Sequence, residues 1–270
     1  MTKHIVCYSG GHSSALVAIE VARKFGKENT ILLNHDLNPR VEEADIKRFK
    51  KEVADYLGIS ITYANHPDWE TKDQFDVVMD AKAFKVGNGT ALCTHRLKTF
   101  PFEKYLKENH PEKDVVIYYG FDADEPHRIQ RRSGILGVQG FKTDYPLALW
   151  EDRTIYSTKE IGIEPPNSYN VFKHANCTGC LKAGKQHWYL VYLNRPDLWE
   201  KGKQAEEEIG YSILNEGELQ DLEPLFAQMK CLGITTTEHE DARTFWARVR
   251  KQTKLIVKSD PDGKPCECVF

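Results

Sequence analysis

The sequence lacks any apolar run long enough to cross a membrane, because a transmembrane helix needs about 20 consecutive apolar residues. No signal peptide precedes its first apolar segment, and we find neither an internal repeat nor a low-complexity tract. These absences predict a cytoplasmic globular protein without membrane partners. With 270 residues, the chain is long enough for one α/β domain and a smaller second one.

An excess of charge of one sign is also missing. Lys and Arg number 37 against 40 Asp and Glu, which gives a net charge of −3. The chain as a whole is therefore not built to attract nucleic acid, and no basic helix or recognition module is apparent. The net charge does not exclude a local basic patch, so a nucleic acid is still a possible acceptor.

Cysteine is present in an odd number. Seven cysteines without an export signal favour reduced thiols, metal ligands or redox chemistry over a disulfide framework. Cys7 and Cys231 lie in apolar surroundings, so we expect both to be packed thiols.

A glycine-rich turn between an apolar segment and a helix-like run is the most informative feature of the chain. Glycines let the backbone approach an anion closely, and serine hydroxyls and the amides of a helix N-terminus donate to its oxygens. The turn lacks the Lys-Ser/Thr ending of a Walker A loop. The expected phosphate-binding residues are Ser9, Gly10, Gly11, His12, Ser13 and Ser14.

Apolar segments alternate with helical patterns in the first part of the chain. Strands are expected at 3–9, 30–34, 59–63 and 115–119, and helices at 15–24 and 41–57. This alternation predicts an α/β fold with a doubly wound, mainly parallel sheet, whose ligands bind at the carboxyl ends of the strands. We expect a nucleotide-binding domain over 1–168 and a helical, cysteine-bearing C-terminal region over 169–270, with helices at 185–193, 198–209 and 241–251.

Other polar residues also follow predicted strands. Asp36 is a candidate for the ribose or adenine of a nucleotide, or simply caps a turn. Gly120 follows the fourth strand and is a further candidate nucleotide contact. Asp122 and Asp124 are candidate Mg²⁺ ligands, since hard cations take carboxylate oxygens, although acids in a loop are most often only solvated.

Four further segments occur in a recognisable order behind the turn. They are Cys93-Thr94-His95-Arg96-Leu97-Lys98-Thr99-Phe100-Pro101-Phe102, then Gly120-Phe121 with Arg128 and Arg131, then Pro146-Leu147-Ala148-Leu149-Trp150, and finally Cys177-x-x-Cys180. Over residues 3–190 this order resembles the PAPS and APS (sulfonucleotide) reductase family of the PP-loop ATP pyrophosphatase superfamily. The resemblance implies the adenine nucleotide alpha-hydrolase-like fold. It also implies roles for Lys98 and Arg128 in catalysis and for Arg131 in nucleotide binding.

The resemblance also bears on the cysteines. Iron–sulfur members of the family carry a Cys-Cys pair where this chain has Cys93-Thr94. Thiolates that converge from distant segments select iron–sulfur clusters or zinc. We expect Cys93, Cys177 and Cys180 to hold a 4Fe-4S cluster, with zinc as the alternative. The fourth position is left open or is filled by Cys266 or Cys268.

Three functions are compatible with these features. The first is an enzyme that binds ATP, activates an acceptor by adenylation and transfers sulfur to it, with a sulfur donor as partner. The second is a reductase that releases sulfite from PAPS or APS, with Cys268 as nucleophile and a thioredoxin-like reductant. The tail Glu267-Cys268 matches the family's Glu-Cys, but its Gly and His are absent. The third is a non-catalytic nucleotide-binding protein. All three functions are compatible with a homo-oligomer.

Overall fold

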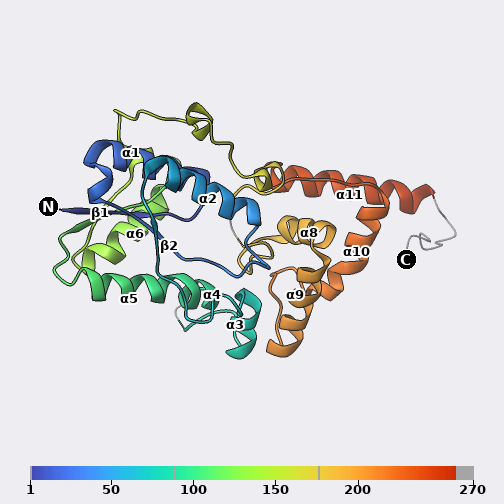
Figure 1. The fold of residues 1–270 in the computed structure, drawn as a ribbon. Coiled ribbons are helices and arrows are strands. Elements are labelled where there is room, and N and C mark those ends of the chain that lie inside the picture. Colours follow the sequence, from blue (N-terminus) through green and yellow to red (C-terminus); the bar gives the residue numbers. More distant parts are fainter. Residues whose placement is uncertain (1, 88, 176, 260–270) are drawn as a thin grey trace. The chain divides into compact units, whose positions relative to one another are not determined.

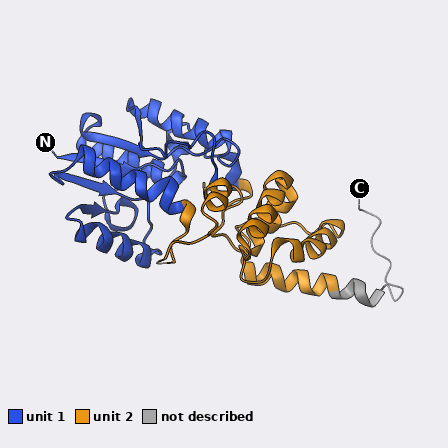
Figure 2. Ribbon diagram, turned by 90° about the horizontal axis from the view of Figure 1, so that it is seen from below, with its two compact units in different colours: residues 1–73, 94–169 blue, residues 74–93, 170–270 orange. Residues whose placement is uncertain are grey.

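The computed structural model describes residues 2–87, 89–175 and 177–259 (Figure 1). The chain divides into two compact units (Figure 2). Unit 1 comprises residues 1–73 and 94–169, and unit 2 comprises 74–93 and 170–270. The sequence pattern placed one boundary at 168/169 and carried no sign that 74–93 groups with the C-terminal part. Throughout the described residues, every helix is too short or too polar to span a lipid bilayer.

Unit 1 is built on a five-stranded sheet in which all strands are parallel. The strand order is β3-β2-β1-β4-β5. The strands are β1 (Lys3–Cys7), β2 (Thr30–Asn34), β3 (Ile61–Tyr63), β4 (Val115–Tyr118) and β5 (Lys142–Asp144). The α/β class and the parallel sheet are thus confirmed. Strand β5 was not predicted, because Lys-Thr-Asp has no apolar pattern.

Helices cover both faces of this sheet (Figure 1). On one face, Val6 and Leu32 pack with α1 (His12–Phe25), α2 (Ala44–Leu57) and α7 (Pro146–Leu149). On the other face, Ile5 and Leu33 pack with α5 (Phe100–Asn109) and α6 (Pro126–Val138). Neighbouring residues of one strand point to opposite faces, so a strand covered on both sides is apolar throughout. The sheet is therefore doubly wound.

The first helix begins earlier than the sequence pattern predicted. Strand β1 ends at Cys7, and α1 begins at His12 rather than Ala15. The left-handed backbone of Gly10, with φ of +84°, turns the chain sharply between the two elements. As a result, His12, Ser13 and Ser14 belong to the first turn of α1.

Unit 2 is helical and packs around aromatic side chains. Trp188, Trp199 and Phe226 are almost completely buried and contact one another in a chain of rings. Gly202 allows this packing, since a Cβ there would lie 2.8 Å from both Trp188 and Leu219. The helices are α3 (Gln74–Asp80), α4 (Leu92–Thr94, which ends one residue into unit 1), α8 (Lys185–Asn194), α9 (Pro196–Ile209), α10 (Leu219–Cys231) and α11 (Ala242–Ser259).

Helices α8 and α9 were predicted with ends that differ by at most two residues, and α11 was predicted to end at 251 but continues to Ser259. Helices α3, α4 and α10 were not predicted. Short 3-10 turns lie at η1 (Lys27–Asn29), η3 (Thr158–Ile161) and η4 (Asn167–Asn170), and a π-helical segment lies at η2 (His95–Thr99).

Candidate phosphate-binding site and cysteine turn

The glycine-rich turn lies where the direction of winding of the sheet reverses. Strands β1 and β4 are neighbours, and the chain continues from β1 to β2 on one side and from β4 to β5 on the other. In open parallel sheets, ligands bind in the crevice outside the carboxyl ends of such strands. The turn after β1 and Gly120 after β4 both lie at this point.

Hydrogen bonds between its own residues stabilise the turn. The hydroxyl of Ser14, which is buried, donates to the carbonyl of Gly11 over 2.8 Å. The hydroxyl of Ser9 donates to Ser14 Oγ over 3.3 Å. Ser9 and Ser13 are exposed, and no acidic residue lies in the first turn of α1. The N-terminus of α1 is therefore free of negative charge, as an anion site requires.

Gly120 forms the other wall of the turn. A Cβ at this position would lie 2.9 Å from the carbonyl carbon of Ser13 and 3.0 Å from the amide nitrogen of Ser14. Because both contacts are with backbone, they could not be relieved by turning a side chain. The end of β4 is thus pressed directly against the first turn of α1, and glycine is required there for packing.

His12 makes contacts that tie the turn to the chain near η3 and η4. Its backbone N–H donates to the hydroxyl of Tyr169 over 3.0 Å, and its Nε2 accepts from the N–H of Thr158 over 3.2 Å. Burial lowers the pKa of His12, which favours the neutral ring that this contact needs. These contacts give His12 a structural role, and its contact with phosphate stays a prediction.

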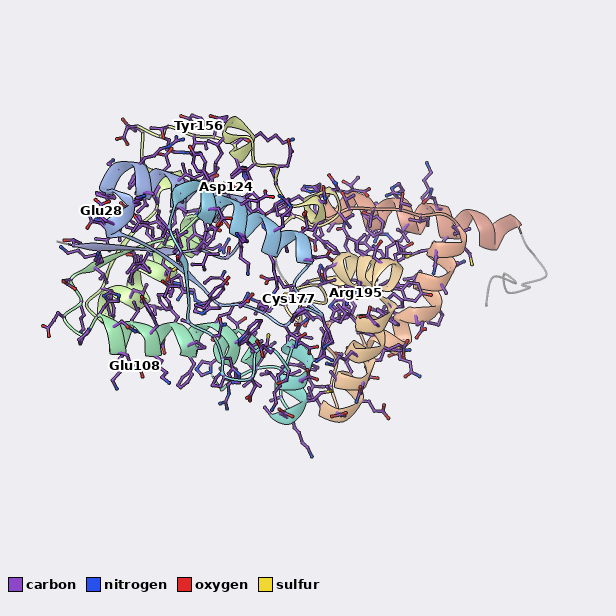
Figure 3. All side chains as sticks on the ribbon, viewed as in Figure 1. Glu28, Glu108, Asp124, Tyr156, Cys177 and Arg195 are labelled. Carbon is purple, nitrogen blue, oxygen red and sulfur yellow. The ribbon has the colours of Figure 1, made fainter. Side chains whose placement is uncertain are left out.

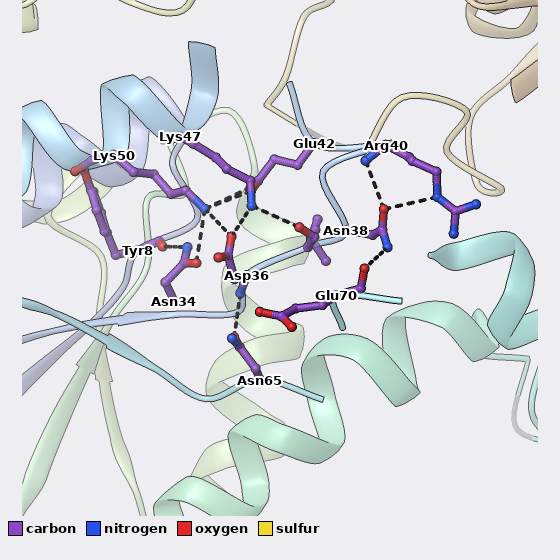
Figure 4. A network of polar contacts seen from close by, with 11 residues as sticks. Tyr8, Asn34, Asp36, Asn38, Arg40, Glu42, Lys47, Lys50, Asn65 and Glu70 are labelled. Carbon is purple, nitrogen blue, oxygen red and sulfur yellow. Dashed lines mark hydrogen bonds and ion pairs between the residues drawn. The ribbon is translucent and has the colours of Figure 1, made fainter. Parts of the chain in front are cut away.

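A buried lysine beneath the turn was missed by the sequence interpretation (Figure 4). The side chain of Lys50 is only 2% exposed. Its Nζ donates to both carboxylate oxygens of Glu42, at 3.1 and 3.0 Å, to Asp36 at 3.2 Å and to Asn34 at 3.3 Å. A Cβ on Gly10 would lie 2.6 Å from Lys50 Cγ, so the stem of the lysine runs directly under the turn.

Asp36, a predicted nucleotide contact, belongs to this network. Its Oδ1 accepts from Lys47 over 2.9 Å as well as from Lys50. Burial by itself would raise the pKa of Asp36, but the hydrogen bond from Lys47 and the charges of both lysines lower it below its usual range. For Glu42, burial outweighs the lysines and raises the pKa. Asp36 is thus held ionised by two cations, and a contact with ribose or adenine is untested.

One sequence signal could have revealed Lys50. Ile46, Phe49 and Val53 form the buried stripe of α2, and Lys50 lies within that stripe at helical spacing. A charged residue on an apolar stripe needs a buried partner.

Lys98 lies in the π-helical segment η2, which joins α4 to α5. π-helical turns are rare and occur frequently at functional sites. The ring of His35 follows β2, and its pKa is lowered first by burial and further by the charge of Lys98. Lys98 is therefore close to the carboxyl edge of the sheet, where its predicted role requires it, although the role itself is untested.

The arginines after β4 lie on α6, a basic helix that was not recognised in the sequence. Arg128 is exposed, pairs with Glu125 and stacks over the ring of Phe121 at 4.1 Å. Arg131 is exposed as well. Arg132 is half-buried, and its guanidinium lies 5.4 Å from the centre of the Tyr119 ring. Arg132 thus lies next to the end of β4, and the predicted role of Arg131 in nucleotide binding is untested.

The Cys-x-x-Cys segment forms a tight turn in unit 2, where Cys177 is labelled in Figure 3. Gly179 has a φ of +72°, and its Cα lies against the ring of Phe75. The amide of Gln74 donates to the carbonyls of Thr178 at 2.8 Å and Gly179 at 3.2 Å. A hydrogen bond from the Cys177 thiol is the main cause that lowers the pKa of Cys180, so the two sulfurs are in contact.

These thiols fit the expected metal site only in part. Cys93 is buried in α4, within unit 2 like the other two cysteines. In the described part of the chain, however, no three His, Cys, Asp or Glu side chains are placed to hold one metal ion. The contact between Cys177 and Cys180 supplies two ligands. The cluster and its zinc alternative therefore stay predictions.

The remaining candidates differ in their outcome. Cys7 is packed as expected, and burial raises its pKa to about 12. The expectation for Cys231 was wrong, because it lies on the exposed face near the end of α10. Asp122 and Asp124 are exposed, and their role in binding Mg²⁺ is untested. Cys266 and Cys268 lie outside the described residues.

Comparison with known proteins gives one informative similarity. The chain is 27% identical over 209 residues to a protein of Escherichia phage lambda described as uncharacterized nin region protein ORF290. The match covers 68% of this chain and 67% of the phage protein. No family model and no solved structure matches the chain. Since the description of the phage protein names no activity, the function has to be inferred from the site.

Proposed function

We propose that the protein is an adenine-nucleotide enzyme of the PP-loop type, with the adenine nucleotide alpha-hydrolase-like fold, that activates an acceptor by adenylation. The observation that carries the proposal is the turn between β1 and α1, with its left-handed Gly10 and with Gly120 packed on the Ser13–Ser14 backbone. Its place beside β4, at the reversal of winding, is where open parallel sheets bind ligands.

The groups at this turn suit the phosphates of ATP. The exposed hydroxyl of Ser13 can donate to phosphate oxygens, and that of Ser9 can do so by turning away from Ser14. The amides of the first turn of α1 can also donate, apart from that of His12, which donates to Tyr169. An oxygen of the acceptor attacks the α-phosphorus, the bond to the bridging oxygen breaks, and pyrophosphate leaves. A sulfur nucleophile then displaces AMP. Lys98, close to the carboxyl edge of the sheet, is a candidate to balance the charge that develops on the phosphates.

A sulfonucleotide reductase is the second candidate, and a non-catalytic nucleotide-binding protein is the third. The reductase requires a nucleophile that the sequence resemblance assigns to Cys268. Sulfite release from PAPS or APS, dependent on thioredoxin, would identify it. Exchange of pyrophosphate into ATP in the presence of an acceptor would identify adenylation. Tight nucleotide binding with neither reaction would favour the third.

Nucleotide binding itself is tested by removing single donors from the turn. Ser9→Ala and Ser13→Ala should each weaken the binding of ATP, measured by calorimetry, by about 1–3 kcal/mol, the range for a lost hydrogen bond to a charged group. The exposed Ser60, which precedes β3 in the same unit, provides the control, and Ser60→Ala should bind as the parent does. If ATP, AMP and PAPS bind both turn variants as tightly as the parent, the site has been assigned wrongly.

A further inference from the structure

Unit 2 contains a cavity at the start of α8 that the proposed nucleotide site does not include. Its volume is about 540 Å³. Cys180 lines it, together with Lys182, Lys185 and His187. Trp246 of α11 forms part of the wall, and the ammonium of Lys185 lies 4.2 Å from the centre of its ring. The cavity is large enough for a small organic molecule, and its three lysines outnumber its two glutamates, Glu216 and Glu238, which favours an anionic one.

The sulfur of Cys180 is the nucleophilic atom of this wall. The Cys177 thiol and the backbone N–H of Lys182 both donate hydrogen bonds to it. Of the two cysteines, Cys180 is the one that lines the cavity, where its sulfur can reach a bound disulfide. Cys177 is half-buried and lies in contact with the same sulfur.

The turn that carries the two cysteines is fixed from two sides. Gln74 of α3 holds the carbonyls of Thr178 and Gly179. On the other side, the N–H of Cys180 donates to Nε2 of His187 over 3.2 Å. Nδ1 of His187 lies 2.5 Å from Oε1 of Glu238. Since Nε2 accepts, the proton is on Nδ1 and is donated to Glu238, so His187 positions the backbone of Cys180.

From this arrangement we propose that Cys177 and Cys180 form a redox-active dithiol that exchanges with a small anionic disulfide of the glutathione type bound in the cavity. The Cys180 thiolate attacks one sulfur of the external disulfide, whose S–S bond breaks and releases one thiolate. The Cys177 thiol loses its proton to that thiolate and attacks the sulfur of Cys180. The protein disulfide forms, the second small thiolate leaves, and it takes up a proton. The protein loses two electrons, and the external disulfide gains them.

This proposal does not depend on the nucleotide chemistry, because it concerns residues of unit 2 alone. It competes directly with the metal prediction, since a thiolate bound to a cluster or to zinc would not exchange in this way. One set of measurements on the full chain therefore decides between them.

The experiment starts from full-length protein reduced with a phosphine and kept anaerobic. After incubation with mixtures of reduced and oxidised glutathione, peptide mass spectrometry should show the loss of two hydrogens from the peptide that carries Cys177 and Cys180. In Cys177→Ser the reaction should stop at glutathione bound to Cys180, and in Cys180→Ser no disulfide should form. The exposed Cys231 provides the matched control, because Cys231→Ser should form the disulfide as the parent does.

The role of the cavity has its own test. Lys182→Gln combined with Lys185→Gln should slow exchange with glutathione disulfide several-fold and leave exchange with the neutral hydroxyethyl disulfide unchanged. Equal slowing of both would overturn the anionic preference. The dithiol itself is overturned if Cys177 and Cys180 stay reduced in mixtures that modify Cys231, or if the purified protein contains iron or zinc that Cys177→Ser removes.

Discussion

The buried ammonium of Lys50 leads to the most demanding prediction about how the glycine-rich turn after β1 is supported. Replacement by methionine keeps most of the stem beneath Gly10 and removes the charge. The carboxylates of Glu42 and Asp36, whose side chains are 5% and 15% exposed, then lose one of the two ammonium groups that they share. Removing one partner of a buried ion pair costs about 3–5 kcal/mol, because the other charge remains buried.

The structure places the expected loss near the lower end of that range. Lys47 stays in place, with its Nζ 2.9 Å from Asp36 and 3.5 Å from Glu42, and its side chain is 29% exposed. It can therefore compensate in part. We expect Lys50→Met to lower the free energy of unfolding of unit 1 by about 3 kcal/mol at pH 8. The neighbouring Lys51 pairs with Asp55 at the surface, where its side chain is 75% exposed, so Lys51→Met should cost less than about 1 kcal/mol.

The loss should also depend on pH, and its sign follows from Glu42. Burial already raises the pKa of Glu42 above its usual range. Without Lys50 that pKa rises further, so the folded variant takes up a proton at a pH where the unfolded chain has not yet done so. Its stability relative to the parent therefore increases as the pH falls. The difference between Lys50→Met and the parent should be smaller at pH 5 than at pH 8.

Hydrogen exchange in increasing denaturant, followed in peptides from β1 and β2, measures the stability of unit 1 apart from that of unit 2. The double variant Lys50→Met with Glu42→Gln should recover a substantial part of the loss, because it removes both buried charges. If Lys50→Met and Lys51→Met are equally stable at pH 8, or if the loss does not change with pH, Lys50 does not support the turn as described.

Two further predictions concern single contacts. Gly120→Ala should weaken ATP binding or destabilise unit 1 by about 1–3 kcal/mol, because its Cβ would overlap the backbone at Ser13. The control is Gly134→Ala on α6, where a Cβ would meet nothing within 4 Å, and it should be neutral or stabilising. Calorimetry and hydrogen exchange measure both variants, and equal effects of the two changes would contradict the packing role of Gly120. In unit 2, the buried carboxylate of Glu206 accepts from the N–H groups of Ile213 and Leu219, at 2.7 and 2.6 Å. Glu206→Ala should therefore lower the free energy of unfolding by at least about 2 kcal/mol in denaturant titrations, since two buried donors lose their acceptor. The exposed Glu207 provides the control. If Glu207→Ala is as unstable as Glu206→Ala, the lost hydrogen bonds do not explain the effect.

The sheet and the glycine-rich turn after β1 could be predicted because local pattern determines them. An apolar strand, a glycine pair and a helix that begins with serines are read directly from neighbouring residues. Side-chain partners were not predictable in this way. The choice of Arg131 came from the family resemblance, whereas the contact of Arg132 with the Tyr119 ring depends on how α6 packs against the end of β4. Likewise, no local pattern indicates that 74–93 belongs to unit 2.

The turn also shows why a local motif and its buried support have to be considered together. Two separate features of the structure require glycine at position 10. Its φ of +84° disfavours any side chain, and its Cα faces the stem of Lys50, which would lie 2.6 Å from a Cβ. The first feature is visible in the sequence as a Gly-Gly turn. The second depends on α2, some 40 residues further along, which places a lysine under the turn to pair with Asp36 and Glu42 after β2. The backbone that would cradle phosphate is therefore held in shape by an ion network that itself contains no residue of the turn, and the network can be altered without touching a phosphate donor.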